Sequence, residues 1–436
     1  MAFTRREFIV ASTAGVAASL PMATARDARA QPLPLETFSD WLRADRETRK
    51  RGLEQCLQRI RELEPTIHAW AHVEPGQSAG EGPLAGIPFG VKDIVETKGM
   101  ATEYGSLLYK GRLGTADAAI VRQLRERGAL LLGKTVTTAF AYRTPGPTRN
   151  PRNPNHTPGG SSSGSAAAVA AGMVPFTVGE QTRGSMIRPA SFCGITGFKP
   201  TYGVLPMEGV FVLAKSLDTL GFYTHTPADM IALWAAIGKS TGSDEEFPFA
   251  VPEPMLDCDP EMATTFQQTI TSLRRGGVTI RTIDCADLLR KLDEANSVEM
   301  MYEGARRHQA RLKEFGDALD QPLADLIREG LKISTARYSD ATKFIADSRG
   351  RFAEIFTSTP VVLTPAAPGP APVGLSTTGD PRMNAPWTAL GTPAVSIPMP
   401  VASGLPLGLQ LTADLGQDAR LLRAARLVDQ RMRKTS

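Results

Sequence analysis

The sequence predicts an α/β protein built as a single domain, and three observations support this prediction. Two short apolar runs rich in β-forming residues, 87–91 and 174–178, are typical of buried strands. Helix-forming stretches accompany them: the small-residue run 166–172 and the amphipathic segments 299–314 and 321–331. No linker, repeat or break in composition divides the 436 residues, and a chain of this length can form one large α/β domain.

Residues 1–30 resemble a twin-arginine export signal. The pair Arg5-Arg6 precedes a mild apolar run, 8–20, that is too short to span a bilayer comfortably. Ala28-Arg29-Ala30 offers an A-x-A cleavage site, which a disordered basic tail, the alternative interpretation, would not need. We therefore expect a periplasmic or secreted protein of residues 31–436 that has no stable membrane anchor and crosses the membrane already folded.

Charge and cysteine content exclude several other classes of protein. Removal of the first 30 residues, which hold four arginines and two acids, would leave a net charge of +2, too small to favour binding to nucleic acid or to membranes. The chain shows no metal-ligand spacing and no glycine-rich nucleotide fingerprint, so we expect no metal and no cofactor. Cys258 and Cys285 could pair after export, and the sequence leaves both this pairing and the oligomeric state open.

Lys92 is the candidate general base of a serine nucleophile. A serine hydroxyl needs a base to remove its proton, and none of the five histidines falls inside a Gly/Ser cluster. Lysine can take this role when burial lowers its pKa, because desolvation disfavours the ammonium form. Lys92 follows directly on the predicted buried strand 87–91. The alternative is a simple ion pair with Asp93 at the strand end.

The first Ser/Gly-rich segment, 159–165, has no long side chains, so its backbone can approach a reacting atom closely. The helix-forming run 166–172 follows at once, and a helix N-terminus favours developing negative charge. The alternative, a flexible Ser/Gly linker, does not fit the apolar flanks. Residues 160–164 also match the G-x-S-x-G nucleophile elbow, but three prolines in 150–158 occupy the place where that motif needs a strand.

The second Gly/Ser-containing segment, 179–188, follows the predicted strand 174–178 and is interpreted as a turn. Ser185 comes directly after Gly184 in this segment. Successive backbone N–H groups in such a turn can form an oxyanion hole, which needs no special side chains.

Together these segments resemble the amidase signature family, serine hydrolases that cleave amide bonds with a Ser-Ser-Lys triad. The resemblance is dense over 82–221 and 361–411 and fades over 243–346. It implies a single α/β/α domain with a mixed central sheet covered by helices, a catalytic core at 81–221 and a variable helical region at 243–346. It also implies a small-molecule amide substrate, no cofactor and no nucleic-acid partner.

The resemblance assigns a role to each catalytic residue. Ser185 is implied to be the nucleophile, Ser161 the bridging serine in a cis peptide linkage, and Lys92 the base. The backbone amides implied to frame the oxyanion hole are those of Thr182, Arg183, Gly184 and Ser185.

The second loop departs from the commonest family pattern, G-T-D-T-G-G-S. Glu180 stands in place of Thr, Gln181 in place of Asp, and Arg183 in place of Gly. Arg183 lies two residues before Ser185, so we expect it to project toward the acyl pocket and to bind substrates that bear a carboxylate.

Two other functions are compatible with the same sequence features. In the first, the protein is a catalytically silent binding protein with Arg183 in the oxyanion site. In the second, it is a conventional Ser-His-Asp esterase, which needs one of the five histidines beside a serine loop. A third family role, within a tRNA-dependent amidotransferase, is cytoplasmic and does not fit an exported protein.

Overall fold

The computed structural model describes residues 35–76, 80–402 and 404–435. They belong to one compact unit, Leu35–Ser436. The expected export signal at residues 1–30 lies outside the described residues. None of the described helices is both long enough and apolar enough to cross a membrane.

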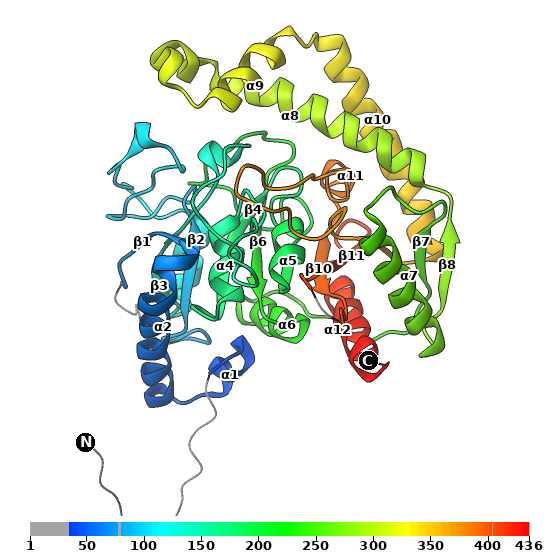
Figure 1. Cartoon of the computed structure of the whole chain (residues 1–436), viewed down its shortest axis with the longest axis horizontal. Helices are drawn as coiled ribbons and strands as arrows, with labels where there is room; N and C mark the ends of the chain where they lie inside the picture. Colours follow the sequence, from blue (N-terminus) through cyan, green and yellow to red (C-terminus); the bar gives the residue numbers. More distant parts are fainter. Residues whose placement is uncertain (1–34, 77–79, 403, 436) are drawn as a thin grey trace, which may run out of the picture. The chain divides into compact units, whose positions relative to one another are not determined.

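One mixed sheet organises the described part of the chain (Figure 1). Its eleven strands lie in the order β1-β3-β2-β4-β6-β5-β10-β11-β9-β7-β8. Strand β2 is parallel to β3 and β4, strand β7 is parallel to β8 and β9, and the remaining pairs are antiparallel. The strand bounds are β1 Trp70–Val73, β2 Pro88–Lys92, β3 Leu130–Thr135, β4 Phe176–Gln181, β5 Thr196–Lys199, β6 Thr219–Thr224, β7 Phe249–Pro252, β8 Ile280–Ile283, β9 Val361–Pro365, β10 Ala394–Pro398 and β11 Gly408–Ala413.

Helices pack against this sheet along its length. Helix α4 contacts β2, β3 and β4, α5 contacts β5, β10 and β11, and α12 contacts β10 and β11. The helix bounds are α1 Phe38–Arg43, α2 Arg46–Ile67, η1 Leu107–Tyr109, α3 Ala119–Glu126, η2 Ala139–Ala141, α4 Ser163–Ala170, α5 Ile187–Cys193, α6 Pro227–Ala236, α7 Pro260–Arg275, α8 Ala286–Phe315, η3 Gly316–Ala318, α9 Gln321–Lys332, α10 Thr335–Ser358, α11 Ala385–Leu390 and α12 Asp418–Thr435. The predicted α/β class with a mixed sheet is thus confirmed.

Strands β2 and β4 bring the two halves of the candidate site together. Both are buried along their whole length and match the apolar runs predicted as strands. They are parallel neighbours, with Val91 opposite Val178. The carboxyl ends of parallel neighbours meet at one edge of a sheet, which is where open α/β sheets bind their ligands. Lys92, the last residue of β2, therefore lies beside the loop that follows Gln181 at the end of β4.

Helices α8 and α9 contain the two amphipathic segments predicted from the sequence. Helix α8 packs against α9, α10 and α11 (Figure 1). Its N-terminal half carries three residues that reach the second Gly/Ser loop or its cavity: Asp293, Asn296 and Met300.

The cysteines and the acidic and imidazole side chains form no cross-link or metal centre within the described residues. All four cysteines are free thiols in the structure, including Cys258 and Cys285, whose pairing the sequence left open. No cluster of three or more metal-ligating side chains occurs in the described ranges.

Candidate active site

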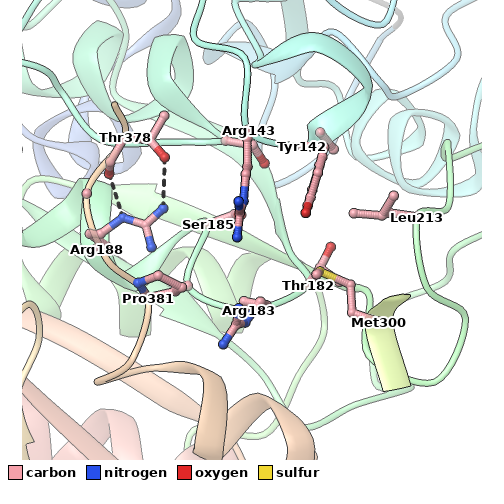
Figure 2. A pocket seen from close by; sticks show the side chains of 14 residues that line it. Tyr142, Arg143, Thr182, Arg183, Ser185, Arg188, Leu213, Met300, Thr378 and Pro381 are labelled. Atoms are coloured by element: carbon pink, nitrogen blue, oxygen red, sulfur yellow. Dashed lines mark hydrogen bonds between the residues drawn. The ribbon is translucent and has the colours of Figure 1, made fainter. Parts of the chain in front are cut away.

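A small cavity of about 110 Å³ lies at the C-terminal edge of β2 and β4 (Figure 2). Both predicted catalytic serines, Ser161 and Ser185, are among its lining residues. Its walls come from the two Gly/Ser loops, the segment after β3, helix α8 and the loop before α11. The lining residues are Ala141, Tyr142, Arg143, Ser161, Thr182, Arg183, Gly184, Ser185, Arg188, Leu213, Met300, Thr378, Gly379 and Pro381.

Lys92 contacts Ser161 directly. Its ammonium donates a hydrogen bond of 2.6 Å to the Ser161 hydroxyl, and its side chain is fully buried. The Gly160–Ser161 peptide bond is cis, as the family resemblance implies. Arg188 holds the same segment, since its Nη2 donates to the Gly160 carbonyl at 2.7 Å. Lys92 therefore has the place that a base acting through Ser161 requires.

Lys92 does not pair with Asp93, which was the alternative considered from the sequence. Asp93 lies 3.4 Å from the ammonium of Lys134 instead. The ionic partner of Lys92 is Glu180, whose Oε2 lies 2.9 Å from Nζ. Burial lowers the pKa of Lys92, and the Glu180 carboxylate opposes that shift.

The side chain of Gln181 shapes the turn that carries Ser185. Its Oε1 accepts hydrogen bonds from the backbone N–H groups of Met186 and Ile187, at 2.8 and 3.1 Å. Its Nε2 donates to Thr388 Oγ1 in α11 at 3.0 Å. The loop between β4 and α5 is thus closed across its base by a single amide, which can act as acceptor and donor together.

Glycine is required at position 184 by the packing around the turn. A Cβ atom there would come within 2.5 Å of the Asn384 side-chain oxygen and within 2.9 Å of Arg188 Nη1. The tight approach brings the C-terminal loop against the residue that precedes Ser185, which fixes the turn between two parts of the chain that are far apart in sequence.

The backbone of the turn is arranged as an oxyanion hole would be. Within the described chain, the N–H groups of residues 182–185 donate no hydrogen bond to another residue. The carbonyls face the other way: the Tyr223 hydroxyl donates to the carbonyl of Ser185 at 3.3 Å and to that of Met186 at 3.1 Å. N–H groups that border a cavity and have no internal partner can bind a developing negative charge.

Ser162, the serine at the centre of the G-x-S-x-G match, is not placed as a nucleophile. Its side chain is fully buried, donates to the Glu180 carbonyl at 2.9 Å and accepts from the Glu180 N–H at 3.2 Å. It therefore joins the first Ser/Gly loop to β4. This agrees with the argument from the three prolines that the G-x-S-x-G match is not a nucleophile elbow.

None of the five histidines, all of which are described, is among the residues that line the cavity. His308, for example, is buried in α8, where its ring stacks on Phe211 and its Nε2 donates to the Val212 carbonyl at 3.0 Å. A histidine base for Ser161 or Ser185, which the esterase alternative needs, is not placed at the cavity.

Arg183 lines the cavity, but its guanidinium already has a partner in the protein. It forms an ion pair with Asp293 of α8. Its position therefore departs from the silent-binder alternative, in which it would fill the oxyanion site. Two further arginines line the same cavity: Arg188, which is buried, and Arg143, which is exposed (Figure 2).

Comparison with known proteins identifies the family. The Amidase family model matches residues 53–422. The chain belongs to the amidase family. Its members cleave carbon–nitrogen bonds, and this amidase is accordingly a C–N hydrolase, not a silent binding protein.

Curated relatives of this amidase are components of glutamyl-tRNA(Gln) amidotransferases. It is 31% identical over 406 residues to the A-subunit of that enzyme from an Exiguobacterium species, and the match covers 80% of this chain and 85% of the relative. It is 30% identical over 474 residues to the corresponding protein of a Synechococcus species, and the match covers 91% of this chain and 97% of the relative.

Solved structures show the same fold. A crystal structure of an amidase superposes with a TM-score of 0.80 at 29% identity and covers 87% of this chain and 95% of the other. The A-subunit of the Thermotoga maritima glutamyl-tRNA(Gln) amidotransferase gives 0.79 at 27% identity, covering 90% and 94%. The peptide amidase of Stenotrophomonas maltophilia gives 0.71 at 25% identity, covering 87% and 93%.

The structure places two polar residues, Glu180 and Gln181, near the candidate catalytic residues, and neither had a role assigned from the sequence. Both were visible in the sequence as departures from the commonest family pattern. Their contacts could not be read from it, because Glu180 reaches Lys92 only through the pairing of β2 with β4, and Gln181 reaches Thr388 only through the docking of α11.

Proposed function

We propose that this amidase hydrolyses a small carboxylic amide through a Ser-Ser-Lys triad and an acyl-enzyme intermediate. Ser185 Oγ attacks the amide carbonyl carbon, its proton passes to Ser161 Oγ, and the Ser161 proton passes to the neutral amine of Lys92. The N–H groups of residues 182–185 bind the oxyanion. The relay then returns the proton to the leaving amine, and water hydrolyses the ester on Ser185.

The contact between Lys92 and Ser161 is the observation that supports this proposal most directly. A fully buried lysine within 2.6 Å of a serine hydroxyl can exchange a proton with it. Ser161 and Ser185 line one cavity, so the proton can pass from the nucleophile to the base inside a single site.

The charge of the cavity supports a substrate that bears a carboxylate. Three arginines and no acidic residue are among its lining residues. Asp293 offsets the charge of Arg183, whereas Arg143 forms no ion pair with another described residue. Guanidinium groups bind carboxylates through two parallel hydrogen bonds, so a small amide with a carboxylate fits this lining.

Replacement of the nucleophile tests the proposed activity. Ser185→Ala should abolish hydrolysis of small amides, with a loss on the order of 10³-fold or more in kcat, because no other group can form the acyl-enzyme. Circular dichroism and thermal melting should show that the variant keeps the parent fold. Amide hydrolysis within about tenfold of the parent would exclude Ser185 as the nucleophile.

We further propose that the enzyme is exported and acts outside any amidotransferase, the enzyme that its curated relatives are named for. The twin-arginine-like segment at the N-terminus, the A-x-A sequence at 28–30 and the small net charge of the remaining chain support this proposal. A role within a glutamyl-tRNA(Gln) amidotransferase is the second candidate function, and it is supported by the identity to those relatives.

Replacement of the twin arginines separates the two candidates. The double variant Arg5→Lys, Arg6→Lys keeps the charge but removes the pair that the export receptor reads. It should leave unprocessed protein inside the cell, whereas the parent should appear outside as a shortened chain. Fractionation and N-terminal sequencing of both proteins measure this. Equal secretion of the variant would contradict the twin-arginine route.

A further inference from the structure

Glu180 and Lys92 form an ion pair that is closed off from solvent. Glu180 is 1% exposed and Lys92 is not exposed at all, and their charged atoms lie 2.9 Å apart. The same ammonium donates to the Ser161 hydroxyl at 2.6 Å. Lys92 Nζ thus lies between a carboxylate and the serine that it must deprotonate. A carboxylate in this position has no part in the Ser-Ser-Lys relay itself.

The groups around the pair leave Glu180 as its main electrostatic partner. The Thr182 hydroxyl donates to Glu180 Oε1 at 3.0 Å, which orients the carboxylate. Asp218, just before β6, also faces the pair, but burial raises its pKa well above the usual range, which favours its neutral form. Tyr223 from β6 is likewise kept neutral, because burial raises its pKa well above 10.

A buried carboxylate beside Lys92 makes it harder for the ammonium to lose the proton that it must lose to act as a base. Desolvation alone favours the neutral amine, whereas an adjacent negative charge favours the ammonium. Lys92 in this site experiences both effects, and the interaction with Glu180 acts at contact distance in a dry environment, where it is strongest.

We propose that Glu180 is a positioning residue that sets the pH range of the enzyme, by holding Lys92 in place and requiring a higher pH for its conversion to the free amine. This inference rests on the proposed Ser-Ser-Lys mechanism. At rest the pair is an ammonium beside a carboxylate. One proton must leave the pair for solvent to give the amine beside the carboxylate, and this form then accepts the Ser161 proton while Ser161 takes the proton of Ser185.

Glu180→Gln tests the proposal through the pH profile of kcat/KM. Glutamine has nearly the same shape and can still accept from Thr182, but it carries no charge. The acid limb of the profile should move to lower pH by about one to three units, because the main group that opposes the desolvation of Lys92 has then lost its charge. The plateau rate should fall, since a less basic amine is a poorer proton acceptor. A merely structural ion pair would change the stability of the fold and leave the acid limb in place.

Three companion variants make the outcome decisive. Glu180→Asp keeps the charge, so its acid limb should stay near that of the parent. Glu180→Thr introduces the residue of the commonest family pattern, and it should show the same downward shift if the glutamine variant fails to fold. An acid limb at the parent's pH in both uncharged variants, or one moved to higher pH, would overturn the proposal. Ser185→Ala, assayed in parallel, identifies failure of the mechanism itself, because it would then keep its activity.

Discussion

The Ser161 hydroxyl accepts a hydrogen bond from Lys92, and Ser161 also lines the cavity that holds Ser185, the proposed nucleophile. The role of Ser161 therefore depends on its neighbours. The Lys92 ammonium lies 2.6 Å from this hydroxyl, and Arg188 fixes the carbonyl of the preceding residue. A serine in this position has no independent function as a base, because its own hydroxyl must be reprotonated at every step. Lys92 and Ser161 should therefore act as one unit.

Single and double replacements measure this coupling. Lys92→Ala and Ser161→Ala should each impair amide hydrolysis severely, and the double variant should be little worse than the more damaged single variant, since losses within one relay do not add. Steady-state kcat/KM of the four proteins on one amide gives the coupling energy. If the two single losses multiply in the double variant, the residues do not share a relay.

The residue types of the proposed triad could be predicted from the sequence, but their electrostatics could not. Short Ser/Gly segments beside apolar runs limited the nucleophile and the bridging serine to a few positions. The sequence showed Glu180 only as a departure from the commonest family pattern, and it did not indicate which residue Glu180 contacts. Its contact with Lys92 exists because β2 and β4 are parallel neighbours, and a single sequence does not specify which strands pair.

At the scale of elements, helix α8 covers the turn that carries Ser185. Asp293 pairs with Arg183, and Asn296 Nδ2 donates to the Thr182 carbonyl at 3.4 Å. The helix therefore determines where the guanidinium of Arg183 lies relative to the cavity. Loss of Asp293 would release that guanidinium, whereas loss of Arg183 would remove it.

Replacement of Arg183 and replacement of Asp293 should have opposite effects on substrate preference. Arg183→Gly should weaken the hydrolysis of carboxylated amides relative to neutral ones by about tenfold or more, which corresponds to one charge-assisted contact of roughly 1.5–3 kcal/mol. Asp293→Asn should raise the same ratio, because it frees Arg183 to bind the substrate. The measurement is kcat/KM for one neutral and one carboxylated amide in three proteins. If the ratio of kcat/KM for the carboxylated amide to that for the neutral amide is unchanged in both variants, Arg183 does not bind the substrate and only holds α8 in place.

The existence of α8 and α9 could be predicted from the helical period of their apolar residues, but the extent of α8 could not. The amphipathic segment began at residue 299, whereas α8 begins at Ala286. The earlier turns include Asp293 and Asn296, polar residues that face the Ser185 loop and therefore interrupt the apolar period. The apolar pattern therefore does not reveal the part of α8 that lies nearest the cavity.

At the scale of the whole molecule, His308 makes the fold sensitive to acid. It accepts from Arg311 at Nδ1 and donates to the Val212 carbonyl at Nε2, an arrangement that only the neutral ring allows. Burial, with a smaller contribution from Arg311, lowers the pKa of His308 from 6.5 to about 3. Below pH 6.5 the His308 ring is protonated in the unfolded chain but stays neutral in the folded chain, down to about pH 3. The free energy of unfolding therefore falls as the pH drops through this range.

His308→Gln should remove this acid sensitivity. Glutamine can donate to Val212 and accept from Arg311, yet it does not titrate. The variant should be less stable than the parent near neutral pH, and the difference in melting temperature should narrow as the pH falls from about 7 to about 4. Thermal melting at several pH values tests this. A constant difference across the range would mean that His308 does not titrate between the two states.

The presence of a sheet could be predicted from the sequence, but the order of its strands could not. Apolar runs and helix periods predict an α/β protein, and they say nothing of which strands become neighbours. Strand β5 pairs with β10, nearly 200 positions later, because the C-terminal strands close against the centre of the sheet. Such long-range pairings depend on packing between distant segments, which no local pattern records.

The bridge from Gln181 to Thr388 spans 207 positions, and the bond from Thr388 to the Arg183 carbonyl spans 205. During synthesis, the Ser185 turn therefore leaves the ribosome long before its fastening exists. Until α11 has been made and docked, the turn of Ser185, the proposed nucleophile, lacks both of these hydrogen bonds to Thr388. Nascent chains and products truncated before Thr388 therefore lack this support for the turn.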